Sequence, residues 1–276
     1  MSDAFAAALR ARFGEEFRLP DGTANADDLT RMAARRVMRA YSDRPVDEAL
    51  VRALCAVALS APSKSDLQQA DILRVRDPAK RAKLAAWAGD NPWVGAAPVF
   101  LVFLANGRRQ PKLHALRGHP FVNDHLDAFF NASVDAGIAL ATFVAAADAA
   151  GLGTCPISVI RHKIADVSAM LGLPARVFPV AGLCVGGPAH QGGISPRLPT
   201  SLTVHEDRYD EGDLPAAIAD YDARRNLTRP YAKQRDPERF GVAADYGWSE
   251  EKARHYAAPE RADFGAFVRK IGFKLD

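Results

Sequence analysis

Residues 171–189, LGLPARVFPVAGLCVGGPA, contain a change from helix to strand around which the rest of the chain can be arranged. Gly172 and Pro174 are expected to end a short helix that starts near residue 163. The run that follows, VFPVAGLCVGGP at residues 177–188, is apolar over the length of a strand, which predicts a central strand of a sheet. Such a strand requires neighbouring strands and a covering of helices.

Segments upstream supply these neighbours. Residues 97–106, APVFLVFLAN, form a second continuous apolar run and predict another central strand, while residues 71–77, DILRVRD, alternate enough for a third strand. Residues 47–60 follow Pro45 and are apolar on nearly every face, which predicts a buried helix that stops before Pro62. The fold class is therefore α+β, with a mixed sheet sandwiched by long helices.

The longest predicted helix covers residues 123–150, and its residues 136–147 carry no charge. Such a run is too short to span the hydrocarbon core of a bilayer, which takes about 20 residues, so the helix is expected in a protein core. Its alanines and Gly137 allow another helix to approach closely. A surface this apolar exceeds what one domain usually encloses, so we expect a homodimer interface around this helix.

Two further segments follow this helix. Residues 151–163, GLGTCPISVIRHK, are predicted to form a Gly- and Pro-bearing loop of the kind that carries chemistry. Residues 201–210, SLTVHEDRYD, are predicted to form one more strand.

From about residue 210 the composition becomes charged and aromatic, with too few aliphatic residues for an independent core. We therefore expect a core over residues 1–209, in which residues 1–29 are an N-terminal helical extension. Residues 210–276 are expected to form an arm that packs on the core or on a partner subunit.

The composition is that of a soluble globular protein. The chain has 276 residues, is 48% hydrophobic and 25% charged, and carries a formal charge of only +3, which gives little reason to expect a nucleic-acid partner. Three cysteines lie far apart without CxxC spacing, which argues against a disulfide framework or a structural zinc site and fits a reducing cytoplasm. The first residues lack the basic start and apolar block of a signal peptide.

Residues 34–45, ARRVMRAYSDRP, gather four arginines and no lysine directly ahead of the first buried helix. Arg35 and Arg39 are four positions apart, so a helical or tightly curled backbone brings them to one side. Guanidinium groups match phosphate oxygens bidentately and stay charged at any working pH. The run is compatible with a bound phosphomonoester and also with a solvated helix face.

Other kinds of site have less support. The sequence has no G-x-G-x-x-G after a strand and no G-x-x-x-x-G-K-[ST], so neither a dinucleotide-binding fold nor a P-loop is expected. His114, His119 and His125 do not follow the i, i+4 spacing of metal ligands, and no metal is expected. Cys184 lies in an apolar run as a packing thiol, whereas Cys155 is the one thiol to test for reactivity.

The order of these segments resembles the FMN-dependent nitroreductase superfamily. The order is arginines, YSDRPV, an apolar helix, SAPSKSDLQ, a strand, an Asn-bearing turn, a central strand, a long helix and GLGTCPI. The likeness covers residues from about 30 to 209, and LGLPARVFPVAGLCVGGPA with SPRLP and VHEDRY is similar to the oxygen-insensitive NADPH nitroreductase and flavin reductase P branch. The resemblance implies a mostly antiparallel sheet, a homodimer with an extended C-terminal arm, and bound FMN.

The resemblance also implies which residues bind the flavin. Arg35, Arg36 and Arg39 match positions that hold the phosphate and ribityl chain, and Arg197 matches a second cation on the phosphate side. Asn91 matches an amide that reads the pyrimidine edge of the flavin. The other implied contacts are Ser63, Ser65 and Gln68 in or just behind a serine-rich loop, and Pro156, Ile157, Ser158 and Val159 against the ring system.

Three positions depart from the family pattern. Val37 stands where a Ser is usual, Ser195 where a Lys often helps with the phosphate, and residues 156–158 where the closest branch has a Gly pair. Each charge-assisted hydrogen bond is worth about 1.5–3 kcal/mol, so these changes weaken phosphate binding. Lys64 is a candidate to compensate.

The implied function is that of an NAD(P)H-dependent FMN oxidoreductase with ping-pong kinetics. In the family, NAD(P)H gives hydride to flavin N5 and leaves before a nitroaromatic, quinone, azo or flavin acceptor takes the electrons, so no side chain is assigned a catalytic acid–base role. Charge alone suggests Arg161, Arg224 and Arg225 as residues that favour NADPH over NADH.

The expected partners are a second copy of the chain and small molecules, with no nucleic acid and no membrane, in the cytoplasm. Three alternatives remain open. The same scaffold can support other flavin chemistry, such as reductive dehalogenation, ene reduction or flavin fragmentation. The chain can also be a non-catalytic flavin-binding protein, or an anion-binding protein without flavin.

Overall fold

The computed structural model describes residues 2–276, which form two compact units. Residues 37–192 and 261–276 form one unit, here called the sheet unit. Residues up to 36 and residues 193–260 form the other, here called the helical unit. The expected division between residues 209 and 210 cuts the chain differently and stays a prediction.

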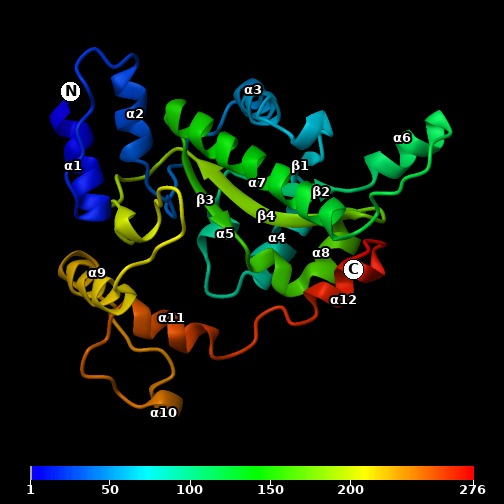
Figure 1. Cartoon of the computed structure of the whole chain (residues 1–276). Coiled ribbons are helices and arrows are strands. Elements are labelled where there is room, and N and C mark those ends of the chain that lie inside the picture. The colour runs from blue at the N-terminus through cyan, green and yellow to red at the C-terminus, as the bar shows by residue number, and fades with distance from the viewer. Residues whose placement is uncertain (1) are drawn as a thin grey trace. The chain divides into compact units, whose positions relative to one another are not determined.

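The sheet unit is built on four antiparallel strands in the order β1-β2-β4-β3 (Figure 1). The strands are β1 (Ala70–Arg74), β2 (Val99–Asn106), β3 (Gly153–Ile157) and β4 (Val177–Gly186). The two central strands, β2 and β4, are the two continuous apolar runs of the sequence, and every residue of β2 is buried. The expected α+β fold with a mostly antiparallel sheet is confirmed.

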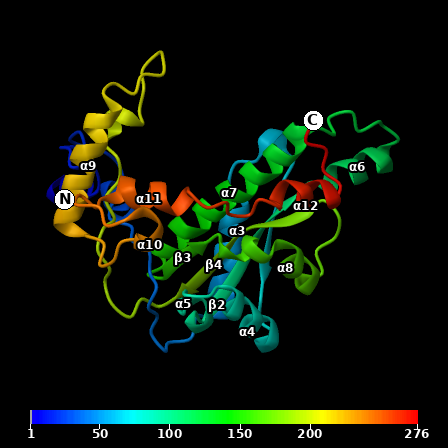
Figure 2. The ribbon, with the colours of Figure 1, turned by 90° about the horizontal axis from the view of Figure 1, so that it is seen from below.

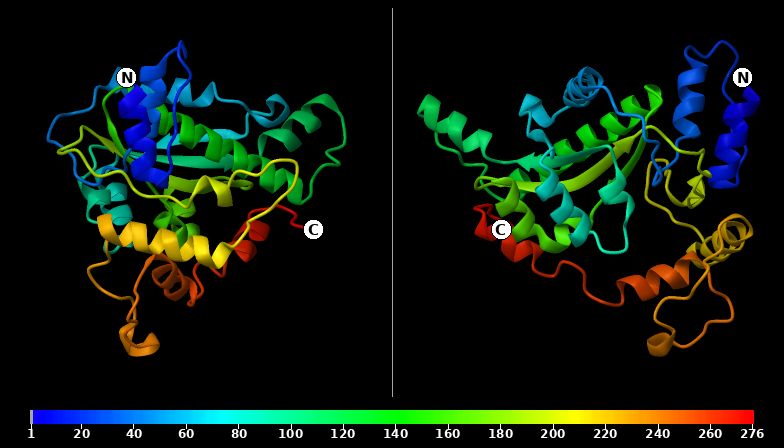
Figure 3. Two further views of the ribbon diagram at one scale, coloured as in Figure 1. Left: turned by 60° about the vertical axis from the view of Figure 1, so that its left-hand side comes forward. Right: turned by 180° about the vertical axis from the view of Figure 1, so that it is seen from behind.

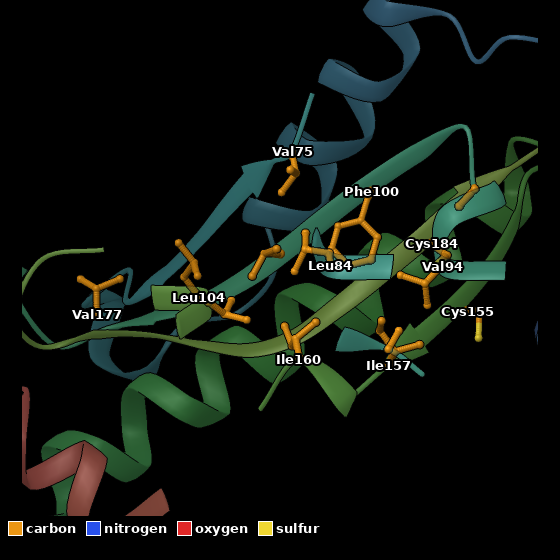
Figure 4. Packing of buried hydrophobic residues seen from close by; sticks show 14 residues of the cluster. Val75, Leu84, Val94, Phe100, Leu104, Cys155, Ile157, Ile160, Val177 and Cys184 are labelled. Carbon is orange, nitrogen blue, oxygen red and sulfur yellow. The ribbon is translucent and has the colours of Figure 1, made fainter. Parts of the chain in front are cut away.

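Helices cover both faces of this sheet (Figures 1 and 3). One face is covered by α3 (Glu48–Leu59) and α7 (Leu126–Ala149), and the other by α4 (Pro78–Trp87), α5 (Trp93–Ala96) and α8 (Ile164–Leu171). Because side chains alternate along a strand, β2 serves both layers. Val99, Leu101 and Phe103 pack with α3 and α7, and Phe100, Val102 and Leu104 pack in the opposite layer, shown in Figure 4.

The sheet unit also contains α6 (Arg109–Arg117), α12 (Phe264–Lys270) and the short 3-10 turns η1 (Lys64–Asp66) and η2 (Val159–Lys163). The apolar C-terminal segment docks as expected, because Phe267, Val268 and Phe273 are buried. Phe273 lies edge-on to Phe178 of β4, with ring centroids 5.7 Å apart. The end of the chain is therefore part of this core.

The helical unit consists of α1 (Ser2–Phe13), α2 (Ala26–Ala33), the 3-10 turn η3 (Thr200–Leu202), α9 (Leu214–Thr228), α10 (Pro237–Phe240) and α11 (Trp248–Tyr256). Within it, α1 lies beside α2 (Figure 1), and α9 lies beside α11 (Figure 2). Tyr221 of α9 meets Trp248 of α11 edge-on at 5.2 Å between centroids.

Two predictions about elements are wrong. Residues 153–157 form an edge strand paired with β4, where a loop was expected, because strand pairing places Gly153 and Pro156 on an edge that tolerates them. Residues 201–210 form no strand, because Val204 and Tyr209 are 67% and 72% exposed and their alternation faces no core.

α7 is long and apolar enough, by length and composition, to cross a membrane. It covers 24 residues rather than the predicted 28, because His125 caps its start by accepting a hydrogen bond from the Asp127 amide. In the structure Ala136, Ala139 and Phe143 of this helix are buried against the sheet unit. It is a core helix of that unit, as expected.

Candidate functional site

Arg35 and Arg36 follow α2 in the helical unit and carry positive charge without a carboxylate partner among residues 2–276. The Arg36 Nε atom is buried and has no hydrogen-bond partner in the same part of the chain. The guanidinium of Arg197, which is exposed, donates within residues 2–276 only to the backbone oxygen of Pro196. A buried donor without an acceptor marks a place where an oxygen-rich ligand fits.

Arg12, a buried residue of α1, lies near the backbone of Arg35 and of Arg197. Burial lowers the pKa of the Arg12 guanidinium, and the charges of Arg197, Arg35 and Arg36 lower it further. Like charges that act on a buried guanidinium are unfavourable, so a bound anion would relieve this repulsion. The sequence prediction of a phosphate site is compatible with this cluster, which we call the cationic cluster.

The remaining predicted residues of the helical unit have other partners. The Ser195 hydroxyl accepts a hydrogen bond from Arg229, a residue that the sequence reasoning did not single out. Arg224 donates to the backbone oxygens of Arg12 and Arg197. Arg225 lies over the ring of Tyr231, 4.1 Å from its centroid. The role of Arg224 and Arg225 toward NADPH stays a prediction.

In the sheet unit, the residues that continue the arginine run lie along the ends of β3 and β4. Val37 forms a bridge with Thr154, and the Met38 amide donates to the Thr154 carbonyl at 2.9 Å. Arg39 is exposed, and its guanidinium carbon lies 5.2 Å from the ring centroid of Trp93. Strand-like pairing therefore positions Val37 and Arg39.

The end of β3 presents the predicted ring contacts. Pro156 and Ser158 are exposed, whereas Ile157 is buried and Val159 is half-buried at the start of η2. Asn91 uses its side-chain amide to donate to the Ala88 carbonyl at 2.6 Å, which leaves its amide oxygen available. These side chains lie in the same unit as Arg39.

Arg161, expected near NADPH, donates to the carbonyl of Val180. Val180 is the extra residue of a bulge in β4, where the register shifts between Phe103 and Leu104 of β2. The bulge falls next to Pro179, which has no amide hydrogen for the ladder. Arg161 thus has a structural partner, and its role toward NADPH stays a prediction.

The serine-rich loop is held by Asp135, a buried carboxylate in the middle of α7. Asp135 accepts hydrogen bonds from the Ser63 hydroxyl at 2.7 Å and from the amides of Lys64 and Gln69 at 3.0 and 3.1 Å. Ser63 in turn accepts from the Gln68 amide at 2.7 Å. The loop is therefore fixed by one carboxylate.

Three residues of this loop, Ser65, Asp66 and Gln68, have left-handed backbone conformations with φ between 49° and 55°. The loop lines a cavity of about 540 Å³ together with Arg109 and Asp135. The Lys64 ammonium donates to the Ser65 hydroxyl at 3.2 Å within the loop. Its role as a substitute phosphate ligand stays a prediction.

Two groups of predicted site residues in the sheet unit, the serine-rich loop and the segment from Val37 to Arg39, lie at opposite ends of the strands. The serine-rich loop leads into Ala70, which pairs with Ala105 of β2. At the other end, Val37 pairs with Thr154 of β3. Thr154 pairs with Val185 of β4, which in turn pairs with Val99 of β2. Six residues of β2 separate these levels, or about 20 Å at 3.3–3.4 Å per residue. One copy of the chain therefore does not bring the two groups together.

Comparison with known proteins identifies the group to which this arrangement belongs. The Nitroreductase family matches residues 32–187, more than half of the chain, and the Nitroreductase family, C-terminal domain, matches residues 195–276. The chain belongs to the nitroreductase family. The family resemblance expected from the sequence is confirmed.

Relatives within the nitroreductase family are similar over most of their length. "FMN reductase [NAD(P)H]" of Bacillus subtilis (strain 168) is 33% identical over 252 residues, which cover 90% of this chain and 98% of the relative. "Oxygen-insensitive NADPH nitroreductase" of Salmonella typhimurium is 35% identical over 209 residues, covering 74% and 85%. The structure of B. megaterium NfrA2 has a TM-score of 0.81 at 34% identity and covers 91% of this chain and 99% of that chain.

Sequence reasoning missed Arg12, Asp135 and Trp93. Asp135 is the one acid in a long apolar stretch of a predicted core helix, and a charge there requires hydrogen-bond partners, so its position was a usable signal. Trp93 directly follows the predicted Asn91-Pro92 turn. Arg12 is one arginine of an ordinary helix and had no signal in the sequence.

Proposed function

We propose that this chain is an NAD(P)H-dependent FMN oxidoreductase that reduces small molecules of nitroaromatic, quinone, azo or flavin type. The observation that carries the proposal is the cationic cluster, in which Arg35, Arg36 and Arg197 have no carboxylate partner among residues 2–276 and Arg36 Nε is a buried donor without an acceptor. A phosphomonoester dianion satisfies both features.

The residues present fit FMN in other respects. Asn91 offers a free amide oxygen, and the exposed Pro156 and Ser158 offer backbone and hydroxyl groups to a flat ring system. Arg39 beside Trp93 adds a cation on an aromatic surface. Within the helical unit we assign the phosphate to Arg35, Arg36 and Arg197. The ring contacts expected within the sheet unit stay predictions.

FMN, when bound, supplies the two-electron redox chemistry that links NAD(P)H to the acceptor. The protein contributes binding, orientation and charge. Guanidinium groups of the helical unit would hold the phosphate of the cofactor. In the sheet unit, the amide of Asn91 would offer hydrogen bonds to the edge of the ring. No side chain is assigned a role as general acid or base, because the flavin carries the redox step.

The same proposal includes a homodimer in the cytoplasm. The serine-rich loop and the Val37–Arg39 segment lie at opposite ends of one sheet, so a flavin site that uses both draws them from different copies. Leu126, Phe130 and Val134 of α7 are 39–60% exposed and lie on one side of that helix, as an interface requires. All three cysteines of the chain are free thiols, which supports a reducing compartment.

The absorbance spectrum of the purified full-length protein tests the proposal. A flavin band that bleaches within seconds on addition of NADPH without oxygen, and returns when nitrofurazone is added, is the expected result. A colourless protein that takes up no FMN contradicts it. A bound flavin that does not respond to NADPH or NADH indicates a flavin-binding protein without this activity.

A further inference from the structure

Arg12 connects two segments of the helical unit that are far apart in the sequence. Its Nη2 donates to the carbonyls of Ala33 and Arg35 at 2.9 and 2.7 Å, and its Nη1 donates to the carbonyl of Ser195 at 3.2 Å. Its Nε donates to the Ala33 carbonyl at 3.2 Å. A single side chain thus binds the backbone that carries Arg35 and the backbone that precedes Arg197.

The backbone of the same residue strengthens this connection. The Arg12 carbonyl accepts hydrogen bonds from the Arg197 amide at 2.6 Å and from Arg224 Nη1 at 3.2 Å. Arg224 Nη2 donates to the Arg197 carbonyl at 2.6 Å. The Arg197 peptide is therefore held on both sides, through its amide and through its carbonyl.

Glu15 and Gly14 add further contacts between the end of α1 and the rest of the helical unit. The Glu15 carboxylate accepts from the Thr200 amide at 2.6 Å and from the Thr200 hydroxyl. Gly14 has a φ of +77°, and a Cβ there would lie 2.6 Å from the Arg224 side chain, so only glycine allows this close approach. The carboxyl end of α1 is thus fitted to the segment from Ser195 to Thr200.

Burying the charged Arg12 side chain near other cations is energetically unfavourable. Arg12 is only 9% exposed, and the charges of Arg197, Arg35 and Arg36 act unfavourably on its guanidinium. A buried guanidinium beside like charges is unfavourable unless its donors are satisfied and an anion is present. Its donors are satisfied by carbonyls of the two segments that carry the proposed phosphate ligands.

We propose that Arg12 is a positioning residue for the cofactor phosphate, which holds Arg35, Arg36 and Arg197 in a fixed arrangement before FMN binds. The inference rests on the proposed function. A ligand site whose charged groups are already ordered binds more tightly, because less conformational entropy is lost on binding. Arg12 lies before residue 32, where the match to the Nitroreductase family begins, so this positioning residue lies outside the matched region.

The test compares FMN with riboflavin, which has the same ring system and no phosphate. The full-length protein, freed of flavin, is titrated with each compound by fluorescence quenching. The variants are Arg12→Met, which removes the charge and the donors, and Arg12→Lys, which keeps the charge but cannot reach three carbonyls. Arg10→Met is the matched control, because Arg10 lies on the same helix and forms an exposed ion pair with Glu16.

Arg12→Met is expected to raise the Kd for FMN about 10- to 100-fold and to leave the Kd for riboflavin within about twofold. Arg12→Lys is expected to resemble Arg12→Met, because positioning depends on the hydrogen-bonding fork, and Arg10→Met is expected to resemble the wild type. Full recovery by Arg12→Lys would mean that Arg12 acts through its charge alone and would overturn the inference.

Other outcomes separate this inference from the proposed function. If the wild type binds FMN more tightly than riboflavin and Arg12→Met keeps that preference, the inference is wrong and the proposed function stands. If the wild type binds neither compound, both are wrong. Should Arg12→Met not fold, Arg12→Lys carries the test, since it keeps the charge and removes the hydrogen-bonding fork; a loss of FMN preference of several-fold is expected, and an unchanged preference overturns the inference.

Discussion

Asp135 shows how one buried charge can organise a loop. Its carboxylate is 3% exposed and accepts hydrogen bonds from three groups of the segment that runs from Ser63 to Gln69. That segment contains three residues with left-handed backbone, a conformation that non-glycine residues adopt at a cost. The hydrogen bonds to Asp135 offset this cost and set the position of the serine-rich loop.

We predict that Asp135→Asn lowers the free energy of unfolding by about 2–4 kcal/mol. The hydrogen bonds to the carboxylate are weakened, and the NH2 group of asparagine would face N–H and O–H donors of the loop. Urea unfolding followed by circular dichroism measures the change. Asp127→Asn, the same change at an exposed position of α7, is the control and is expected to cost less. Equal stability of Asp135→Asn and the wild type would show that the loop is held by other contacts.

The thiols provide a second prediction at this scale. Burial raises the pKa of Cys155 although Arg39 and Trp93 oppose the shift, and burial raises the pKa of Cys184 to about 12. Both side chains are at most 2% exposed in the core of Figure 4. At pH 8 both therefore stay protonated and shielded, and the native protein is expected to expose neither to Ellman's reagent.

Unfolding in guanidinium chloride is expected to release three thiols per chain in that assay, since all three cysteines are free. The half-buried Cys55 is the internal comparison, and slow reaction at this residue is compatible with its raised pKa, which burial causes. Rapid labelling of Cys155 in the native protein, located by peptide mass spectrometry, would contradict the prediction.

At the scale of elements, the sequence predicts those parts that local chemistry decides. The helix expected over residues 47–60 is observed as α3 with Asp47 and Ser60 as its caps, because the Asp47 carboxylate accepts from the Leu50 amide at 2.9 Å. The glycine and proline of β3 are typical of loops, and only pairing with β4 makes this segment a strand. Tertiary contacts, not local preference, decide that segment.

Arg176 links three elements of the sheet unit and allows a prediction with a pH dependence. It donates to the carbonyls of Gly107 and Gly272 at 3.1 and 2.6 Å and to Asp124 at 2.5 Å. Burial alone would raise the pKa of Asp124, but the hydrogen bonds and charges of Arg176 and Lys274 lower it below its ordinary value. The stabilisation is therefore present above the ordinary pKa of the carboxyl group and is lost as the pH falls through the lowered pKa.

We predict that Asp124→Asn lowers the free energy of unfolding by about 1–3 kcal/mol at pH 7 and that the difference from the wild type shrinks toward pH 3. Urea unfolding at pH 7 and at pH 3 measures the loss of stability and its decrease with pH. Asp28→Asn is the control, because Asp28 and Arg31 form an exposed pair that is expected to contribute about 0–1 kcal/mol. A cost for Asp124→Asn that is the same at pH 3 and pH 7 would rule out the ion pair as its source.

At the scale of the whole molecule, the sequence predicted the family and the fold more completely than the site. The two apolar runs and the long helix define the sheet unit, because burial on both faces leaves a clear pattern in the residues. The cationic cluster depends on Arg12 and on a segment more than 180 residues later, and no local pattern reports such a contact. The binding roles of the expected residues rest on the family resemblance and stay predictions.

The exposed apolar stripe of α7, which consists of Leu126, Phe130 and Val134, leads to the last prediction. Phe130 is 60% exposed, and exposed aromatic side chains on an apolar stripe are typical of a subunit interface. A glutamate there places a charge where a second copy would exclude water, so Phe130→Glu is expected to shift the protein from about twice the 29.8 kDa of one chain to a single chain.

Sedimentation equilibrium measures this mass, and retention of flavin through gel filtration measures whether the site survives. Because the serine-rich loop and the Val37–Arg39 segment lie at opposite ends of one sheet, loss of the dimer is expected to cost flavin retention as well. Leu227→Glu is the matched control, since Leu227 is 87% exposed on α9 of the helical unit and is expected to change neither readout. A monomeric Phe130→Glu protein that retains FMN fully would show that one copy of the chain completes the site.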